Sequence, residues 1–183
     1  MSKKWKVLSS KELFKAGMFS LRTDECELPD GRRMPRYYVV DFPSWIHIVA
    51  LDERGDLILV RQYRHAAGDE FLEIPGGSMD QHKGETILEA AKRELREETG
   101  YISKQWTLLG EHYPNPALQS NRLITYLARD CVFEGEPQLD PFEDLSVEKV
   151  PVYEVYKLLE QGEIQHSLMM GSLALARRHL MRE

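Results

Sequence analysis

The fold is decided by residues 75–101, PGGSMDQHKGETILEAAKRELREETGY, which contain a glycine turn, a polar loop and a helix. Thr86 followed by Glu89 fits a capping box, so the helix is expected to begin near Ile87. Gly100 stands where a helix end usually needs a left-handed residue. Between these ends, apolar residues recur at helical spacing and predict a buried stripe of Ile87, Leu88, Ala91 and Leu95.

Three glutamates of this helix share a second face. Glu94, Glu97 and Glu98 are spaced i, i+3 and i+4, and each neighbouring pair of like charges costs about 0.2–0.5 kcal/mol. A divalent cation such as Mg²⁺ reverses that repulsion, because it prefers several carboxylate oxygens. Arg93, four residues before Glu97, neutralises it in part. By itself such a run is typical of a solvated, salt-bridged surface helix, but the order of the surrounding motifs favours the cation.

The motifs in this order resemble the Nudix box, whose pattern is G-x5-E-x7-R-E-U-x-E-E-x-G-U, where U is a bulky apolar residue. Glu85 to Tyr101 matches every fixed position. The departure lies before them, since seven residues instead of five separate Gly77 from Glu85. The loop Ser78–Gly84 is therefore two residues longer than the pattern, and the sequence gives these residues no role.

The resemblance implies a metal-dependent site on this helix. Mg²⁺, with Mn²⁺ as a substitute, is expected on Glu94 and Glu98, with Glu97 close by and the backbone carbonyl of Gly76 as a further ligand. Arg93 and Glu85 are expected to support the site through an ion pair that holds the helix and the loop in register.

The general base is expected from a later acidic loop. Asp140-Pro141-Phe142-Glu143-Asp144-Leu145 resembles the family loop that brings in a further carboxylate, which serves as metal ligand or as general base. Glu143 is the first candidate for general base, with Asp140 and Glu97 as alternatives. A solvated acidic loop without a catalytic role is the other interpretation.

Two further segments resemble a subgroup that cleaves nucleoside diphosphate sugars such as ADP-ribose. Val60–Arg64 and Glu73–Gly77 resemble the lead-in to the box in that subgroup. Arg61 and Arg64 are expected to hold phosphate oxygens, because the planar guanidinium binds them in bidentate fashion; surface salt bridges are the alternative. Pro116, fifteen residues past Tyr101, resembles the subgroup's proline, but no Gly follows it and no Ser-Glu pair lies nearby. A broader sugar range is therefore plausible.

Residues 1–43 are expected to form an arm before the Nudix domain, which occupies residues 44–183. Pro29-Asp30-Gly31 is a turn signal between Phe19–Leu28 and Arg33–Asp41, which predicts a β-hairpin. Aromatic residues gather where the arm meets the domain, and they either pack together or stack a nucleobase: Tyr37, Tyr38, Phe42 and Trp45. The subgroup resemblance implies a homodimer in which the arm crosses to the partner.

The rest of the chain alternates strands and helices. Strands are expected at Trp45–Leu51, Asp56–Gln62, Trp106–His112, Leu123–Leu127 and Leu145–Val150, and helices near Val152–Gln161 and Ser167–Met181. In the last helix the predicted core residues are Leu168, Ala174, Leu175, Ala176 and Leu180. The resemblance implies the Nudix fold, an α/β/α sandwich around a mixed β-sheet.

Composition excludes several classes of protein. The net charge of −6 over 183 residues argues against a general nucleic-acid binder. No apolar run approaches the ~20 residues that span a bilayer, and no apolar segment follows the N-terminal lysines as in a signal peptide. Cys26 and Cys131 show no metal spacing and are expected to be core thiols, which suits a cytoplasmic protein.

Together these features predict an enzyme that hydrolyses a nucleoside diphosphate sugar, such as ADP-ribose or ADP-glucose, to a nucleoside monophosphate and a sugar phosphate. Three alternatives remain at this point. The same fold can act on a nucleoside triphosphate, a dinucleoside polyphosphate or capped RNA; a Nudix domain can sense a nucleotide without catalysis; and the helix can belong to an unrelated interaction protein. The intact Glu94, Glu97 and Glu98 argue against a sensor.

Overall fold

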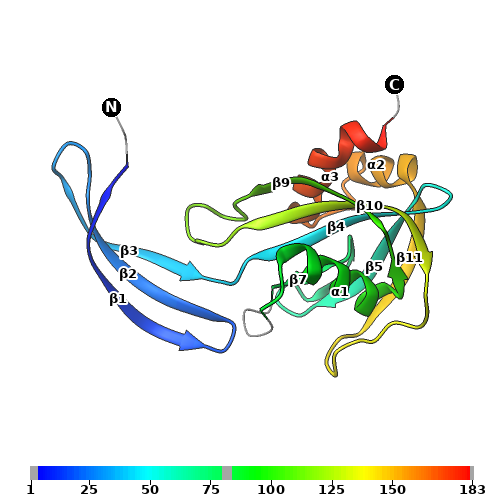
Figure 1. The fold of residues 1–183 in the computed structure, drawn as a ribbon. Coiled ribbons are helices and arrows are strands. Elements are labelled where there is room, and N and C mark those ends of the chain that lie inside the picture. The colour runs from blue at the N-terminus through cyan, green and yellow to red at the C-terminus, as the bar shows by residue number, and fades with distance from the viewer. Residues whose placement is uncertain (1–3, 80–83, 182–183) are drawn as a thin grey trace. The chain divides into compact units, whose positions relative to one another are not determined.

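The computed structural model describes residues 4–79 and 84–181, which form two compact units (Figure 1). One unit contains the residues up to Ser44 together with Tyr113–Arg122. The other contains Trp45–His112 and the chain from Leu123 onward. The segment Tyr113–Arg122 thus belongs with the N-terminal residues, although the sequence places it within a domain that runs from residue 44 to residue 183.

The first unit is an antiparallel sheet with the strand order β1-β2-β3, made of β1 (Lys6–Ala16), β2 (Phe19–Glu27) and β3 (Arg33–Asp41). The hairpin expected from the Pro-Asp-Gly turn is present as β2 and β3, and Gly31 has a φ of 85° in the turn. Strand β1 extends this hairpin; strands and turns were expected within residues 1–43, but no strand was assigned to Lys6–Ala16. Almost all its side chains are exposed, so it lacks the alternating apolar pattern that signals a strand.

The segment Tyr113–Arg122 joins the first unit through its backbone. The Val40 N–H donates to the Leu118 carbonyl at 2.9 Å, and the Ser120 N–H donates to the Val40 carbonyl at 3.2 Å. The Tyr37 hydroxyl also donates to the Ala117 carbonyl at 2.8 Å. The two-proline loop is therefore hydrogen-bonded to β3, not left as a free connection.

The second unit is built on a mixed sheet. The strands follow the order β11-β5-β4-β10-β8, with β6 on β5, β7 on β4 and β9 on β10. Strands β4 and β10 are parallel, and the other pairs are antiparallel. The bounds are β4 (Trp45–Asp52), β5 (Asp56–Arg64), β6 (Asp69–Glu73), β7 (Gly76–Ser78), β8 (Tyr101–Ile102), β9 (Gln105–His112), β10 (Leu123–Phe133) and β11 (Leu145–Pro151).

Helices cover both faces of this sheet, as Figure 1 shows: α1 (Ile87–Thr99) lies on one face, and α2 (Val152–Glu160) and α3 (Ser167–Leu180) on the other. Successive residues of β4 point to opposite faces, so Ile48 packs with Leu95 of α1 while Val49 packs with Leu173 of α3. The predicted α/β/α sandwich around a mixed sheet is confirmed.

Helix α1 has the predicted limits. The Thr86 hydroxyl accepts the Glu89 N–H at 3.2 Å, and Glu89 Oε2 accepts the Thr86 N–H at 2.7 Å, so the capping box is complete. Gly100 ends the helix with a φ of 74°. A Cβ at position 100 would lie 2.0 Å from the Gly135 carbonyl oxygen, so this glycine is required both by its backbone angle and by its neighbour.

Helix α3 is rotated relative to the expected core pattern. Ala174 is exposed, whereas Met169, Ser172 and Leu173 are buried. The prediction of a core position for Ala174 was wrong. The helix carries apolar side chains on more than one of its own faces, so the sequence does not show which face is buried.

Both cysteines are buried free thiols, as expected from the sequence. Burial raises the pKa of the Cys131 thiol to about 12. In the part of the chain that the structure describes, no helix has both the length and the apolar character needed to cross a membrane.

Candidate active site

The centre of the candidate site is the contact between the glycine turn and the carboxylates of α1. The Gly76 N–H donates to Glu98 Oε2 at 2.9 Å. A Cβ at position 77 would lie 2.4 Å from both Cδ and Oε1 of Glu94. A Cβ at position 76 would lie 2.3 Å from the Ile46 carbonyl oxygen, so β7 packs tightly against β4 on its other side. Gly77 therefore lets the main chain approach the Glu94 carboxylate closely, and Gly76 lets β7 approach β4.

Both carboxylates are held in surroundings that disfavour their charge. Glu98 is only 5% exposed, and burial raises the pKa of its carboxyl to about 8. Repulsion from Glu94 and from Glu143 raises the Glu98 pKa further, against the hydrogen bond from Gly76, which lowers it. Burial also raises the pKa of Glu94. A bound cation would stabilise the ionised form of both carboxylates.

The donor set fits one kind of metal site and not another. Within residues 4–79 and 84–181, no three His, Cys, Asp or Glu side chains are arranged to hold a metal ion by themselves. Mg²⁺ is commonly bound by one or two carboxylates, while water and substrate phosphates complete its shell. Glu94 and Glu98 fit this second arrangement, in which the ion is shared with a phosphate substrate.

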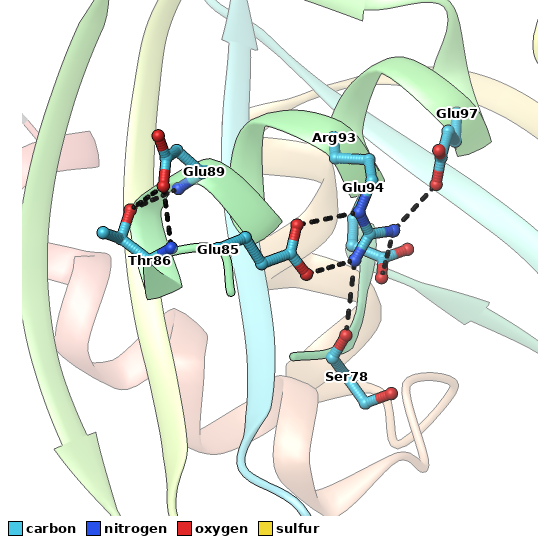
Figure 2. Close-up of polar contacts among 7 residues, drawn as sticks. All are labelled: Ser78, Glu85, Thr86, Glu89, Arg93, Glu94 and Glu97. Atoms are coloured by element: carbon cyan, nitrogen blue, oxygen red, sulfur yellow. Dashed lines mark hydrogen bonds and ion pairs between the residues drawn. The ribbon is translucent and has the colours of Figure 1, made fainter. Parts of the chain in front are cut away.

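Arg93 contacts three glutamates, as Figure 2 shows. Its guanidinium holds Glu85 in a two-bond contact, with Nη2 2.9 Å from Oε1 and Nε 3.1 Å from Oε2. Its Nη1 donates to Glu94 Oε1 at 3.0 Å and to Glu97 Oε2 at 2.8 Å. These bonds, led by that to Glu85, raise the pKa of Arg93. The expected ion pair is present, and Arg93 also reaches two further carboxylates of α1, those of Glu94 and Glu97.

Arg64 lies against a carboxylate that sequence analysis did not single out. Its Nη2 is 2.5 Å from Glu73 Oε2, and His166 Nδ1 lies 3.2 Å from Glu73 Oε1. Burial alone would raise the Glu73 pKa, but the nearby His166 ring and the hydrogen bonds from Arg64 outweigh it and hold the value at about 2. Glu73 therefore joins β5, β6 and the start of α3, and it fixes one edge of the Arg64 guanidinium.

A second buried polar chain continues from there into the sheet. His47 Nδ1 lies 2.9 Å from the Ser172 hydroxyl, and that hydroxyl lies 2.9 Å from Thr125 Oγ1. Burial lowers the pKa of His47 to about 3, so its ring is neutral. The His47 ring packs edge-on against that of His166, with their centroids 6.0 Å apart. The strand beneath the glycine turn is thus fixed to α3 by hydrogen bonds as well as by apolar packing.

Arg61 has a different environment from Arg64. Its Nε lies 2.5 Å from Glu148 Oε1, across to β11, and 40% of its side chain is exposed. The structure therefore places Arg61 in the partly exposed salt bridge that was the alternative interpretation of this residue.

The acidic loop 134–144 is held on the C-terminal end of α1. The Gln138 N–H donates to the Glu97 carbonyl at 2.7 Å, and the Glu134 N–H donates to the Gly100 carbonyl at 2.9 Å. Arg96 adds side-chain contacts, with Nε 2.6 Å from Glu134 Oε2 and Nη1 3.1 Å from the Glu136 carbonyl oxygen. The loop thus contacts the same helix that presents the carboxylates.

The two loop candidates for general base form one closed turn. The Glu143 N–H donates to the Asp140 carbonyl at 2.9 Å, and the Asp140 N–H donates to Glu143 Oε2 at 3.0 Å. Negative charge on Glu143 raises the pKa of Glu94 and of Glu98, so its carboxylate acts on both. Glu97, the third candidate, is hydrogen-bonded to Arg93.

The remaining expected substrate residues fall in both units. Tyr37 and Pro116 lie in the first, where Tyr37 hydrogen-bonds to the Ala117 carbonyl and contacts Trp5 edge-to-face at 6.0 Å. Trp45 begins β4 in the second unit, in register with Leu123 and Ser78. The two-residue insertion in Ser78–Gly84 falls largely on residues 80–83, which lie outside the described residues.

The sequence contained signals for some of the residues that were missed. His47 is a lone imidazole within the apolar strand Trp45–Leu51, and Glu73 is a lone charge between Leu72 and Ile74. A polar residue at a buried strand position usually has a specific partner. Ser172 carries no such signal, since serine is common on helices.

Comparisons with known proteins agree with this geometry. A family model described as the NUDIX domain matches residues 42–170, and one described as the nucleoside diphosphate sugar hydrolase N-terminal domain matches residues 5–40. An ADP-ribose pyrophosphatase of Bacillus subtilis is 31% identical over 160 residues, which are 87% of this chain and 85% of that protein. One from Mycobacterium tuberculosis is 31% identical over 170 residues, 92% of this chain and 81% of that protein.

A solved structure gives a similar result. The crystal structure of an ADP compounds hydrolase matches with a TM-score of 0.83 at 26% sequence identity, covering 97% of this chain and 94% of that one. The resemblance therefore extends over both units of the chain and includes the carboxylate helix.

Proposed function

This chain belongs to the NUDIX domain family of hydrolases, and from that premise we propose that it hydrolyses the diphosphate bond of nucleoside diphosphate sugars such as ADP-ribose or ADP-glucose. The products are a nucleoside monophosphate and a sugar phosphate. The match of residues 5–40 to an N-terminal domain of nucleoside diphosphate sugar hydrolases supports this substrate class, as do the names of the relatives.

One observation carries the proposal: the buried carboxylate of Glu98 and the partly buried carboxylate of Glu94, both with raised pKa values, lie against a glycine main chain. Glu94 and Glu98 hold Mg²⁺, or Mn²⁺ in its place, with Glu97 nearby and the Gly76 carbonyl as a further oxygen. When bound, the ion neutralises diphosphate charge, polarises the attacked phosphorus and lowers the pKa of a bound water.

Glu143 accepts the proton of the attacking water. Its carboxylate influences Glu94 and Glu98 and stands on a loop held to α1, which supports this role over that of Asp140. Glu97 is the weaker candidate, because its carboxylate is already engaged by Arg93, whose Nη1 donates to Glu97 Oε2 at 2.8 Å.

The arginines bind phosphate oxygens or position carboxylates. Arg64 binds phosphate oxygens with the guanidinium edge that Glu73 leaves free, and 48% of its side chain is exposed for that purpose. Arg61 contributes less to phosphate binding, because its guanidinium forms a salt bridge with Glu148. Arg93 and Glu85 position the carboxylates without contacting substrate, while Tyr37, Trp45 and Pro116 contribute to substrate binding.

We also propose that the protein is a cytoplasmic homodimer that binds neither membranes nor nucleic acid. The free, buried thiols of Cys26 and Cys131 suit a reducing compartment. The net charge of −6 counts against capped RNA as the substrate.

Replacement of Glu98 by Gln tests the metal site. We expect kcat/KM for ADP-ribose and ADP-glucose with Mg²⁺ to fall by about 100-fold or more. Glu163→Gln, an exposed glutamate between α2 and α3, is the matched control and should keep the wild-type rate. Unchanged Mg²⁺-dependent turnover in Glu98→Gln would show that the metal site is elsewhere.

The general base is tested separately. Glu143→Gln should lower kcat strongly while Mg²⁺ affinity, measured by calorimetry, stays near that of the wild type. Asp140→Asn and Glu97→Gln serve as comparisons, and a wild-type rate in Glu143→Gln would transfer the role to one of them. Chromatographic separation of the products formed from nucleotide sugars, nucleoside triphosphates and dinucleoside polyphosphates distinguishes this function from its alternatives.

A further inference from the structure

The glycine turn that meets the carboxylates lies directly against the ring of His47. Gly76 of β7 pairs with His47 of β4, and the Ile48 N–H next to it donates to the Pro75 carbonyl at 2.8 Å. A Cβ at position 76 would lie 2.9 Å from His47 Cδ2, so the turn can come this close to the imidazole only because Gly76 has no side chain. The ring therefore supports the turn on the sheet face that α3 covers.

The orientation of this ring is fixed by two hydroxyl groups. Thr125 of β10 is in register with His47, so both side chains lie on the same face of the sheet. His47 Nδ1 lies 2.9 Å from the Ser172 hydroxyl of α3, and that hydroxyl lies 2.9 Å from Thr125 Oγ1. A hydroxyl donates one proton and can accept another, so Ser172 satisfies both neighbours at once. These bonds hold the imidazole in one orientation.

The three polar side chains interrupt an apolar layer. Val49 follows His47 on the same face of β4, and Leu127 follows Thr125 on the same face of β10; both belong to the buried apolar cluster between the sheet and α3. Ser172 and Thr125 are themselves fully buried. Apolar residues at these positions would fill the layer without needing partners, so stability alone does not account for the polar groups. Their arrangement suits a role in holding the ring in place.

We propose that His47 is a positioning residue for the metal site, because its ring holds the Gly76 turn where the N–H meets Glu98. Ser172 and Thr125 act through His47 by keeping that ring in place. The inference rests on the proposed function, in which Glu98 is a metal ligand. The Gly76 N–H donates to Glu98 Oε2 at 2.9 Å, so a displacement of the turn releases or moves that carboxylate. Helix α3 thus contributes to metal binding without contacting the ion.

Mg²⁺ affinity, measured by calorimetry, tests this role. Ser172→Ala removes the hydroxyl that joins His47 to Thr125, and we expect the dissociation constant for Mg²⁺ to rise about tenfold, as when a group behind a metal ligand is lost. The kcat at saturating Mg²⁺ should stay near the wild-type value, because the ligands themselves remain. Ser167→Ala, the same change at an exposed position of α3, is the matched control and should keep both values. Wild-type affinity in Ser172→Ala would overturn the inference.

The amide proton of Gly76 gives a readout that needs neither metal nor substrate. In the metal-free protein its NMR signal should move upfield in Ser172→Ala, because the hydrogen bond to Glu98 weakens. Val155→Ala, which removes buried volume from the same apolar cluster on α2, controls for a general loss of stability and should leave this signal in place. Equal displacement of the signal in both variants would reduce the network to a structural role.

Two substitutions of His47 separate its orientation from its bulk. His47→Phe keeps an aromatic ring but has no atom that can bond to Ser172. His47→Asn places polar atoms where Nδ1 and Cδ2 stand, so it can keep the bond to Ser172. We expect Mg²⁺ affinity to fall in His47→Phe and to recover in part in His47→Asn. Wild-type affinity in His47→Phe would show that bulk alone supports the turn.

The results also separate this inference from the proposed function. If the wild-type protein bound Mg²⁺ but hydrolysed no nucleotide sugar, the substrate would be wrong, and the affinities and the Gly76 signal would still decide the role of His47. If the wild-type protein bound no Mg²⁺, both would fall. Thr125→Val keeps the shape of its side chain and removes only the hydroxyl, so it carries the same test if Ser172→Ala does not fold.

Discussion

Gly77 has no room for a side chain, because Glu94 occupies the space where its Cβ would lie. In Gly77→Ala the methyl group would push the Glu94 carboxylate from its place on the metal face. We expect Mg²⁺ affinity and kcat/KM to fall by at least about tenfold, since small displacements of ligands are costly. Calorimetry with Mg²⁺ and initial rates measure the two effects.

Gly17→Ala is the control for this substitution. Nothing lies within 4 Å of a Cβ at position 17, so the same chemical change should have no effect on the reaction there. If Gly77→Ala kept full Mg²⁺ affinity, Glu94 would have to be free to move, and its assignment as a ligand would be weakened.

Glu73 should make the stability of the protein depend on acid pH. Its folded pKa of about 2 lies below the ordinary 4.5, so its ionisation stabilises the fold above pH 4.5, and this contribution is lost as the pH falls towards 2. At pH 7, Glu73→Gln should lower the free energy of unfolding by on the order of 2–3 kcal/mol. The difference from wild type should shrink steadily below pH 4.5.

Urea unfolding at several pH values between 3 and 7 measures the difference in unfolding free energy between Glu73→Gln and wild type. The linkage relation gives the expected pH dependence of that difference. For the control Glu163→Gln, the difference in unfolding free energy from wild type should not change with pH, because that side chain is exposed. A constant difference for Glu73→Gln would mean that its contacts with Arg64 and His166 do not stabilise the carboxylate.

At the scale of elements, α1 can be predicted because its limits are set by neighbours in sequence. We expect Thr86→Ala to remove half of the capping box and to cost about 1 kcal/mol of stability, measured by urea unfolding. Thr86→Ser retains a hydroxyl at the same place and should recover most of the loss. An unaffected Thr86→Ala variant would show that β-sheet packing alone fixes the start of this helix.

The same reasoning explains which elements could not be predicted. Strand β1 is defined by its pairing with β2 and carries almost no buried side chain, so its sequence does not alternate. Which face of α3 is buried depends on the sheet residues that Met169 and Leu173 pack against. Local capping and turn rules therefore give helix ends and hairpins, whereas edges and ambiguous apolar faces depend on distant partners.

For the candidate site, the sequence predicts the carboxylate face and the Arg93–Glu85 pair, since both lie within one short stretch. It does not predict that Glu73 joins Arg64 to His166, because these residues come from β5, β6 and the start of α3. Nor does it show that Glu148 occupies Arg61. These contacts arise only after the sheet has brought the segments together.

At the scale of the whole molecule, the first unit exposes several large apolar side chains. Val7, Phe14, Met18 and Tyr38 are 46–71% exposed. Exposed apolar residues in this number are typical of a protein interface. We expect the protein to sediment as two chains of 21.3 kDa each.

Val7→Glu should shift the protein towards the monomer, because it places a charge on this apolar surface. Tyr153→Glu, on α2 of the second unit, is the control and should not change the mass. A wild-type mass equal to one 21.3 kDa chain at all concentrations would contradict the homodimer.

The main-chain bonds that hold the acidic loop on α1 have a consequence for adaptation. The amide groups of Glu134 and Gln138 exist whatever side chains those positions carry, so random mutation there does not easily release the loop. Side chains between residues 139 and 144, apart from that of Glu143, can then change while the backbone around them keeps its course. An enzyme built in this way can acquire a new substrate preference in small evolutionary steps, each of which leaves a folded and selectable protein.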